Sequence, residues 1–290
     1  MSMAAINALP DDFPWDQKVG LLLDALQVKN LLKHLYEWSP SSQIDVLYHG
    51  TQWAQISHCS PCLVRLRDRD DPVLLQFLNN TRDQWGYLVV SDGSWQQLLT
   101  HMRWLTSFHP PQDEEMYLRI SDPAVADALF AHELHPSAVL FGPCQQVIVA
   151  NTPLSGWRHY RRTGEAVIPS YEKPYVASDA QWASLRASTF RKSIAELYLH
   201  MQRLFPEYRA ALVPQDRFEH VQQLTNSAVE RGFTGEREIW LYANVFGFLG
   251  DDVLDQHPDI AELLTVKSEL TSFQRVERAA ELAAQRSATH

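Results

Sequence analysis

The first half of the chain alternates between short β-type runs and short helical stretches. Apolar runs or apolar–polar alternation predict strands in four places, at residues 44–47, 62–66, 85–90 and 116–120. Apolar residues at helical spacing predict helices at residues 72–80 and 95–105. Asp122-Pro123 predicts the start of a further helix, because Asp is a favoured N-cap and Pro is favoured in the first turn.

One long helix is predicted before these elements, over residues 15–38. Its apolar residues mostly follow the i, i+3, i+4 spacing of one buried stripe: Val19, Leu22, Leu23, Leu26, Leu31 and Leu35. Ser39-Pro40 then ends the helix, because proline cannot continue the helical hydrogen bonds.

The second half of the chain has a different pattern. Prolines and glycines interrupt any period in residues 151–178, which we interpret as a linker. From residue 179 onward, apolar stripes at helical spacing follow one another, and Gly232 and Gly250 are expected at helix ends. The prediction is therefore an α/β (α+β) N-terminal lobe over residues 1–150 and a mostly α-helical C-terminal lobe over residues 179–290.

Composition and charge exclude some classes of function. The net charge of −10 argues against a nucleic-acid partner, because binding phosphates requires a cationic face. No apolar run is long enough for a membrane span, and the first 15 residues do not resemble a signal peptide. Three cysteines in 290 residues do not suggest a disulfide framework. We therefore expect a cytoplasmic protein without membrane insertion.

Five short motifs occur in order between residues 60 and 143. They are Ser60-Pro61-Cys62-Leu63-Val64, Trp85-Gly86-Tyr87-Leu88-Val89-Val90-Ser91, Leu98-Leu99-Thr100-His101-Met102-Arg103, Leu118-Arg119-Ile120-Ser121-Asp122-Pro123 and Phe141-Gly142-Pro143. In this order and spacing they resemble the type VI secretion effector-adaptor family, whose genes lie beside those of VgrG spike proteins and effectors. We refer to them below as the five landmark motifs.

The resemblance implies a non-catalytic chaperone that binds one effector, contacts VgrG and needs no cofactor. Candidate partner-binding residues are Arg119, Asp122, Phe141, Arg158, Arg161 and Arg162. The three arginines of the 158–162 segment either steer an acidic partner or form a solvated linker face. An immunity protein that neutralises a toxin, and an enzyme of an unrecognised class built on the N-terminal lobe, are the alternatives.

Two further motifs suggest chemistry at first sight. Cys59 and Cys62 have the C-x-x-C spacing of redox or zinc sites, but Cys62 begins a predicted strand and no second ligand pair follows. Asp251-Asp252 with Asp255 resembles a magnesium motif but lies at a predicted helix end. We interpret the first as two separate thiols and the second as a solvated acidic turn. Asp122 is expected to cap the helix that Pro123 begins, with Arg119 paired to Asp122 or to a neighbouring carboxylate.

Overall fold

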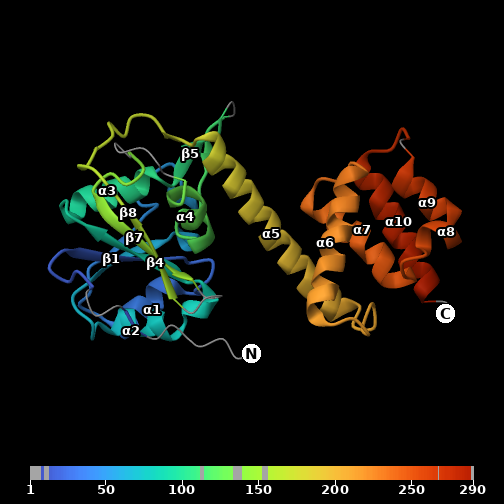
Figure 1. The fold of residues 1–290 in the computed structure, drawn as a ribbon, viewed down its shortest axis with the longest axis horizontal. Helices are drawn as coiled ribbons and strands as arrows, with labels where there is room; N and C mark the ends of the chain where they lie inside the picture. The colour runs from blue at the N-terminus through green and yellow to red at the C-terminus, as the bar shows by residue number, and fades with distance from the viewer. Residues whose placement is uncertain are drawn as a thin grey trace. The chain divides into compact units, whose positions relative to one another are not determined.

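The computed structural model describes residues 8–9, 13–111, 114–132, 139–151, 156–266 and 268–288. The chain forms two compact units, Met1–Ser188 and Thr189–His290. The first contains mixed sheets and helices and the second is helical (Figure 1), so the predicted fold class is confirmed. Helix α5 (Asp179–Leu204) contributes to both units, because Leu185 packs in the core of the first and Ile194 in that of the second.

In the described part of the first unit, six strands form an antiparallel sheet in the order β2-β3-β1-β4-β7-β8. The strands are β1 (Lys18–Leu23), β2 (Ile44–Val46), β3 (Cys62–Leu66), β4 (Gly86–Ser91), β7 (Cys144–Asn151) and β8 (Gly156–Arg161). Gly86 lies opposite Leu23 in the pairing of β4 with β1. A Cβ there would stand 1.8 Å from the carbonyl oxygen of Leu22, and the φ of Gly86 is +156°. The second landmark motif therefore requires glycine at this position.

Helices cover both faces of this sheet (Figure 1). They are α1 (Leu31–Trp38) and α2 (Pro72–Asn79) on one face, and α3 (Trp95–Trp104) and α4 (Pro123–Phe130) on the other. Alternate residues of a strand therefore enter two different cores. In β1, Leu21 and Leu23 pack with α1 and α2, while Leu22 packs with α3 and α4.

The prediction of a single helix over residues 15–38 is wrong. Residues 18–23 form the central strand β1, and only Leu31–Trp38 form a helix. Because β1 is buried on both faces, it is apolar at nearly every position instead of alternating. A short continuous apolar run of this kind fits a buried strand and a helix segment equally well.

The predicted linker also contains regular structure that the sequence pattern did not indicate. Residues 156–161 form β8, which pairs with β7 at the edge of the large sheet. Tyr175–Val176 form β9, which joins β5 (Ser107–His109) and β6 (Met116–Tyr117) in a small sheet. An edge strand with one solvated side carries too few apolar residues to be recognised from the sequence. Residues 152–155 of the predicted linker lie outside the described residues.

The second unit packs its helices around one apolar core. They are α6 (Pro214–Glu230), α7 (Glu236–Leu249), α8 (Val253–Gln256), α9 (Pro258–Thr265) and α10 (Ser272–Ser287), with the C-terminal part of α5. Gly232 and Gly250 follow α6 and α7 with φ values of +86° and +83°, as the sequence predicted for helix ends. No helix within the described ranges combines the length and apolarity needed to cross a membrane.

Candidate functional site

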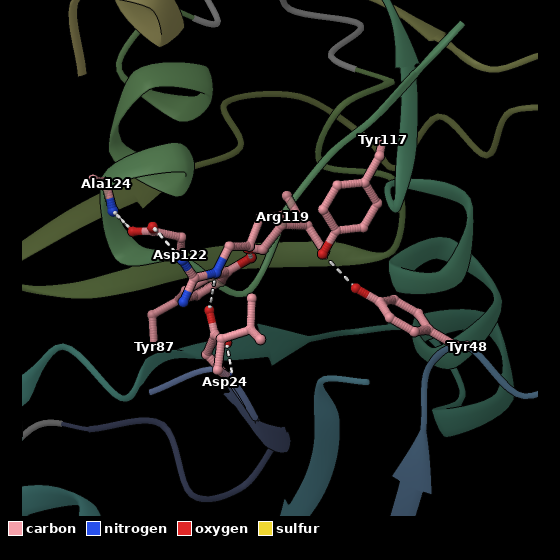
Figure 2. Close-up of polar contacts among 9 residues, drawn as sticks. Asp24, Tyr48, Tyr87, Tyr117, Arg119, Asp122 and Ala124 are labelled. Atoms are coloured by element: carbon pink, nitrogen blue, oxygen red, sulfur yellow. Dashed lines mark hydrogen bonds and ion pairs between the residues drawn. The ribbon is translucent and has the colours of Figure 1, made fainter. Parts of the chain in front are cut away.

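The fourth landmark motif places an arginine between two carboxylates (Figure 2). Arg119 Nε donates a hydrogen bond of 2.7 Å to Asp24 Oδ2, and Arg119 Nη1 lies 3.7 Å from Asp122 Oδ2. The side chain of Asp24 is 2% exposed and that of Arg119 is 21% exposed. The predicted pairing of Arg119 with Asp122 is therefore present, but its shorter contact is with Asp24, which is 95 residues away in the sequence.

Asp24 holds the loop that follows β1. Its Oδ1 atom accepts a hydrogen bond of 2.8 Å from the backbone N–H of Leu26. Its carbonyl oxygen accepts from the N–H groups of Gln27 and Val28. One carboxylate thus connects Arg119 to the backbone of the loop, so the position of residues 24–28 depends on this buried ion pair.

Asp122 caps α4, as the sequence predicted. Its Oδ1 atom accepts a hydrogen bond of 2.9 Å from the N–H of Ala124, and Pro123 occupies the first helical position. The hydroxyl of Tyr87, on β4, donates a 2.8 Å hydrogen bond to the carbonyl of Ile120. The segment that carries Arg119 is therefore attached to the central sheet and to the start of α4.

The ionisable groups here are set up to hold structure. Burial alone would lower the pKa of Arg119, but the hydrogen bond and charge of Asp24 and the charge of Asp122 raise it above its ordinary value. Burial raises the pKa of Tyr87 well above its ordinary value, and it likewise raises that of Tyr48, whose hydroxyl is hydrogen-bonded to that of Tyr117. At neutral pH Arg119 is cationic and the tyrosines keep their protons. We call Asp24, Arg119 and Asp122 the Arg119 cluster.

The other landmark motifs also contact one another. Tyr48 N–H donates to Ser60 Oγ at 3.0 Å, which fixes the first motif beside β2. Ser91 Oγ, at the end of the second motif, donates to the carbonyl of Pro143 at 2.8 Å. Gly142 has a φ of +50°, and a Cβ there would lie 2.5 Å from the His101 ring. The motifs thus form contacts within one unit.

The remaining predicted site residues lie in different environments. Phe141 is 3% exposed and packs against Phe130 with ring centroids 5.0 Å apart, so it is part of the core and offers no surface to a partner. The three arginines lie on β8 or directly after it. Their surroundings differ from one residue to the next.

Two of these arginines are used inside the unit. Arg158 forms an ion pair with Asp127 of α4. Arg162 donates 3.0 Å hydrogen bonds to the carbonyls of Gly142 and Cys144 and pairs with Asp92, and its side chain is only 5% exposed. Arg161 is exposed. Arg162 therefore holds the fifth landmark motif, and Arg161 is the most available of the three.

The cysteines lie in separate positions. Cys59 Sγ contacts the carbonyl of Ile56, and Cys62 is buried at the start of β3, where burial raises the pKa of its thiol to about 12. A thiol with so high a pKa is a poor nucleophile at neutral pH. Within the described ranges, no three His, Cys, Asp or Glu side chains are placed to hold a metal ion.

The acidic turn after α7 has partners that the sequence did not indicate. Asp251 forms an ion pair with Arg209 and accepts a 2.5 Å hydrogen bond from the hydroxyl of Tyr208. His220 Nε2 lies 2.7 Å from the same hydroxyl. Asp251 therefore fixes the loop between α5 and α6 in the second unit. No spacing rule connects Asp251 with residues 208 and 209, so only the structure could identify this contact.

Comparisons with known proteins agree with the resemblance seen in the sequence. Residues 21–138 match the family described as "Domain of unknown function (DUF4123)". The chain is 27% identical to "Accessory protein VasW" of Vibrio cholerae serotype O1 (strain ATCC 39315 / El Tor Inaba N16961) over 289 residues, covering 97% of this chain and 93% of VasW. No solved structure matches the chain significantly. The match over residues 21–138 makes this part of the chain similar to the DUF4123 family, the effector-adaptor domain family of type VI secretion systems.

Proposed function

We propose that this chain is a type VI secretion accessory protein, a non-catalytic adaptor that binds an effector in the cytoplasm and loads it onto the VgrG spike. The match of residues 21–138 to the effector-adaptor family carries this proposal. The similarity to an accessory protein over nearly the whole of both chains supports it, because the helical unit is then part of the shared function.

The chemistry of the Arg119 cluster is consistent with a binding role. A general acid or base must exchange its proton near the working pH. Arg119 stays cationic and Tyr87 stays protonated, and both are already used in internal hydrogen bonds. The cluster therefore acts by holding the backbone of residues 24–28 and 118–124 in place.

Co-expression with the neighbouring effector and VgrG tests the proposal. A chaperone that covers an apolar segment of the effector removes an aggregation surface, so soluble effector should increase when this chain is present. The tagged chain should also purify with the effector and with VgrG, each expressed separately. Equal effector solubility and secretion with and without the chain would contradict the proposal. Protection against the toxin without any effect on its secretion would indicate the immunity function instead.

A further inference from the structure

A groove of about 520 Å³ opens beside the N-terminal end of α1 in the first unit. Its second wall is formed by the 3-10 helix η1 (Ala54–Cys59) and the start of β3. The apolar part of its lining comes from Ala25, Leu31, Leu32, Val46 and Cys62. A volume of this size lies within the range of about 300–1,000 Å³ typical of sites that take a ligand or a few side chains.

Helix α1 carries apolar residues on two faces, and only one face is used by its own core. Leu31 and Leu35 are buried against the sheet. Leu32 and Tyr36 follow one another on another face at i, i+4 spacing, and they are 41% and 54% exposed. An amphipathic helix that only covered a sheet would have polar residues at these positions. The exposed face therefore has apolar surface to offer to a partner.

More exposed apolar side chains adjoin the groove in sequence. Leu26 directly follows the lining residue Ala25 and is 54% exposed, and Ile56 directly precedes the lining residue Ser57 and is 38% exposed. Single exposed apolar residues are common, but here Leu32 lines the groove itself and Leu26 and Ile56 are next in sequence to residues that line it. Leu26, Leu32, Tyr36 and Ile56, with the groove, are called the α1 surface below.

Both walls of the groove are held by landmark motifs. Asp24, bound by Arg119, fixes the loop that carries Ala25, and Ser60 of the first motif accepts a hydrogen bond from Tyr48 N–H. A wall that is already fixed loses little conformational entropy when a partner binds. The Arg119 cluster thus gains a role in binding although it does not face the partner itself.

The charge of the groove is opposite to that of most of the chain. The chain has 35 acidic residues and a net charge of −10, yet none of the residues that line the groove is acidic. Lys33, His49 and His58 contribute nitrogen groups to the lining. Lys33 also pairs with Glu37 at 3.7 Å, but both side chains are more than half exposed, and such pairs exchange partners at little cost. An apolar segment flanked by carboxylates would be accepted here.

We propose that the α1 surface binds one amphipathic segment of the effector, with apolar side chains in the groove and carboxylates near Lys33. This inference rests on the proposed adaptor function. A chaperone must cover apolar residues of its cargo, and apolar side chains at i, i+3 and i+4 spacing fit a groove of this kind. The carboxylates add salt-sensitive orientation more than affinity.

Leu32→Asp is the decisive variant, because it places a negative charge in the apolar lining at a position that is already 41% exposed. The matched control is Leu75→Asp, since Leu75 is 44% exposed, lies on the eight-residue helix α2 of the same unit and does not line the groove. Co-expressed effector captured by the tagged chain should fall at least about tenfold with Leu32→Asp. Capture by Leu75→Asp, VgrG capture and the melting temperature of both variants should stay at wild-type values.

Lys33→Glu provides an independent second measurement. It should slow effector association at low salt, and the difference from wild type should shrink as salt rises, because exposed charges are screened. Wild-type capture of effector by Leu32→Asp would overturn the inference while leaving the adaptor function intact. If Leu32→Asp lost VgrG capture but kept effector capture, or if it only disrupted self-association of this chain, the α1 surface would bind a different partner. Either result would also overturn the inference. Failure of the wild-type chain itself to capture effector would instead overturn the proposed function.

Discussion

The two units use polar side chains in different ways. In the first unit, the Arg119 cluster buries charge, with Asp24 2% exposed, and joins segments 95 residues apart in sequence. In the second unit, Asp251 and Arg209 pair at the surface with 33% and 42% of their side chains exposed. Both contacts fix a loop, but only the first does so at the expense of desolvating charged groups.

This difference follows from how each unit is built. Helices satisfy most of their own backbone groups by internal hydrogen bonds, and those of the second unit pack around one apolar core. The first unit joins strands and loops from distant parts of the sequence, and its irregular segments need partners for their backbone groups. Asp24 and Asp122 each bind backbone N–H groups in addition to Arg119. The buried cluster therefore determines the position of the segments beside the groove.

Removal of one arginine from each unit should show how much more the buried ion pair contributes to stability than the surface ion pair. Arg119→Met leaves the carboxylate of Asp24 buried without its cation, which should cost about 3–5 kcal/mol of unfolding free energy. Arg209→Met breaks only a surface pair and should cost less than about 1 kcal/mol. Eight of the nine tryptophans lie in residues 1–188, so urea unfolding followed by tryptophan fluorescence reports on the first unit.

Circular dichroism of the same samples provides the control, because it also reports on the helices of the second unit. Arg119→Met should shift the fluorescence transition more than the helical signal. Equal losses of unfolding free energy in Arg119→Met and Arg209→Met would show that burial of the Arg119 cluster does not increase its contribution to stability.

Acid should weaken the first unit through His101. Burial lowers the pKa of His101 from 6.5 to about 4, and its Nε2–H donates to the carbonyl of Leu140. The folded state therefore favours the neutral ring. The contribution of His101 to the unfolding free energy is fully present above pH 6.5. It falls as pH decreases from 6.5 towards 4, because in this range only the unfolded chain binds the proton. Between pH 7.5 and pH 5 the loss should be about 2 kcal/mol.

His101→Gln keeps a donor for Leu140 but cannot titrate. The difference between wild type and this variant, measured by urea unfolding at each pH, isolates the contribution of the histidine. In the second unit, burial also lowers the pKa of His220, yet the charge of Asp251 and its hydrogen bond oppose that shift. If the unfolding free energies of wild type and His101→Gln depended on pH in the same way, His101 would not be the cause of the loss of stability in acid.

The sequence predicted local features well. Helical spacing identified the apolar stripes of the second unit, and the Asp122-Pro123 pair identified the start of α4. Each depends on residues within a few positions of one another. The strand β1 was missed because a segment buried on both faces has no alternation to detect.

The contacts that form the candidate site were beyond such patterns. The pair of Asp24 and Arg119, and the groove between α1 and η1, join residues that only the folded sheet brings together. The three arginines at positions 158, 161 and 162 show the converse. They are neighbours in the sequence, but alternate side chains of a strand point to opposite faces of the sheet. Arg158 and Arg162 share one face, where they pair with Asp127 and Asp92.

The smallest expected effect compares helix caps in the two units. Asp122→Ala removes the hydrogen bond to Ala124 and the contact with Arg119, and should cost about 1–2 kcal/mol. Thr271→Ala removes only the cap of α10, where Thr271 Oγ accepts from Gln274 N–H, and should cost about 1 kcal/mol. Asp122→Asn keeps a capping oxygen, so its loss should be the smallest of the three. Urea unfolding of the three variants beside effector capture tests this order. If Asp122→Asn were as damaging as Asp122→Ala, the charge on Asp122 beside Arg119 would be its main contribution, and the cap a minor one.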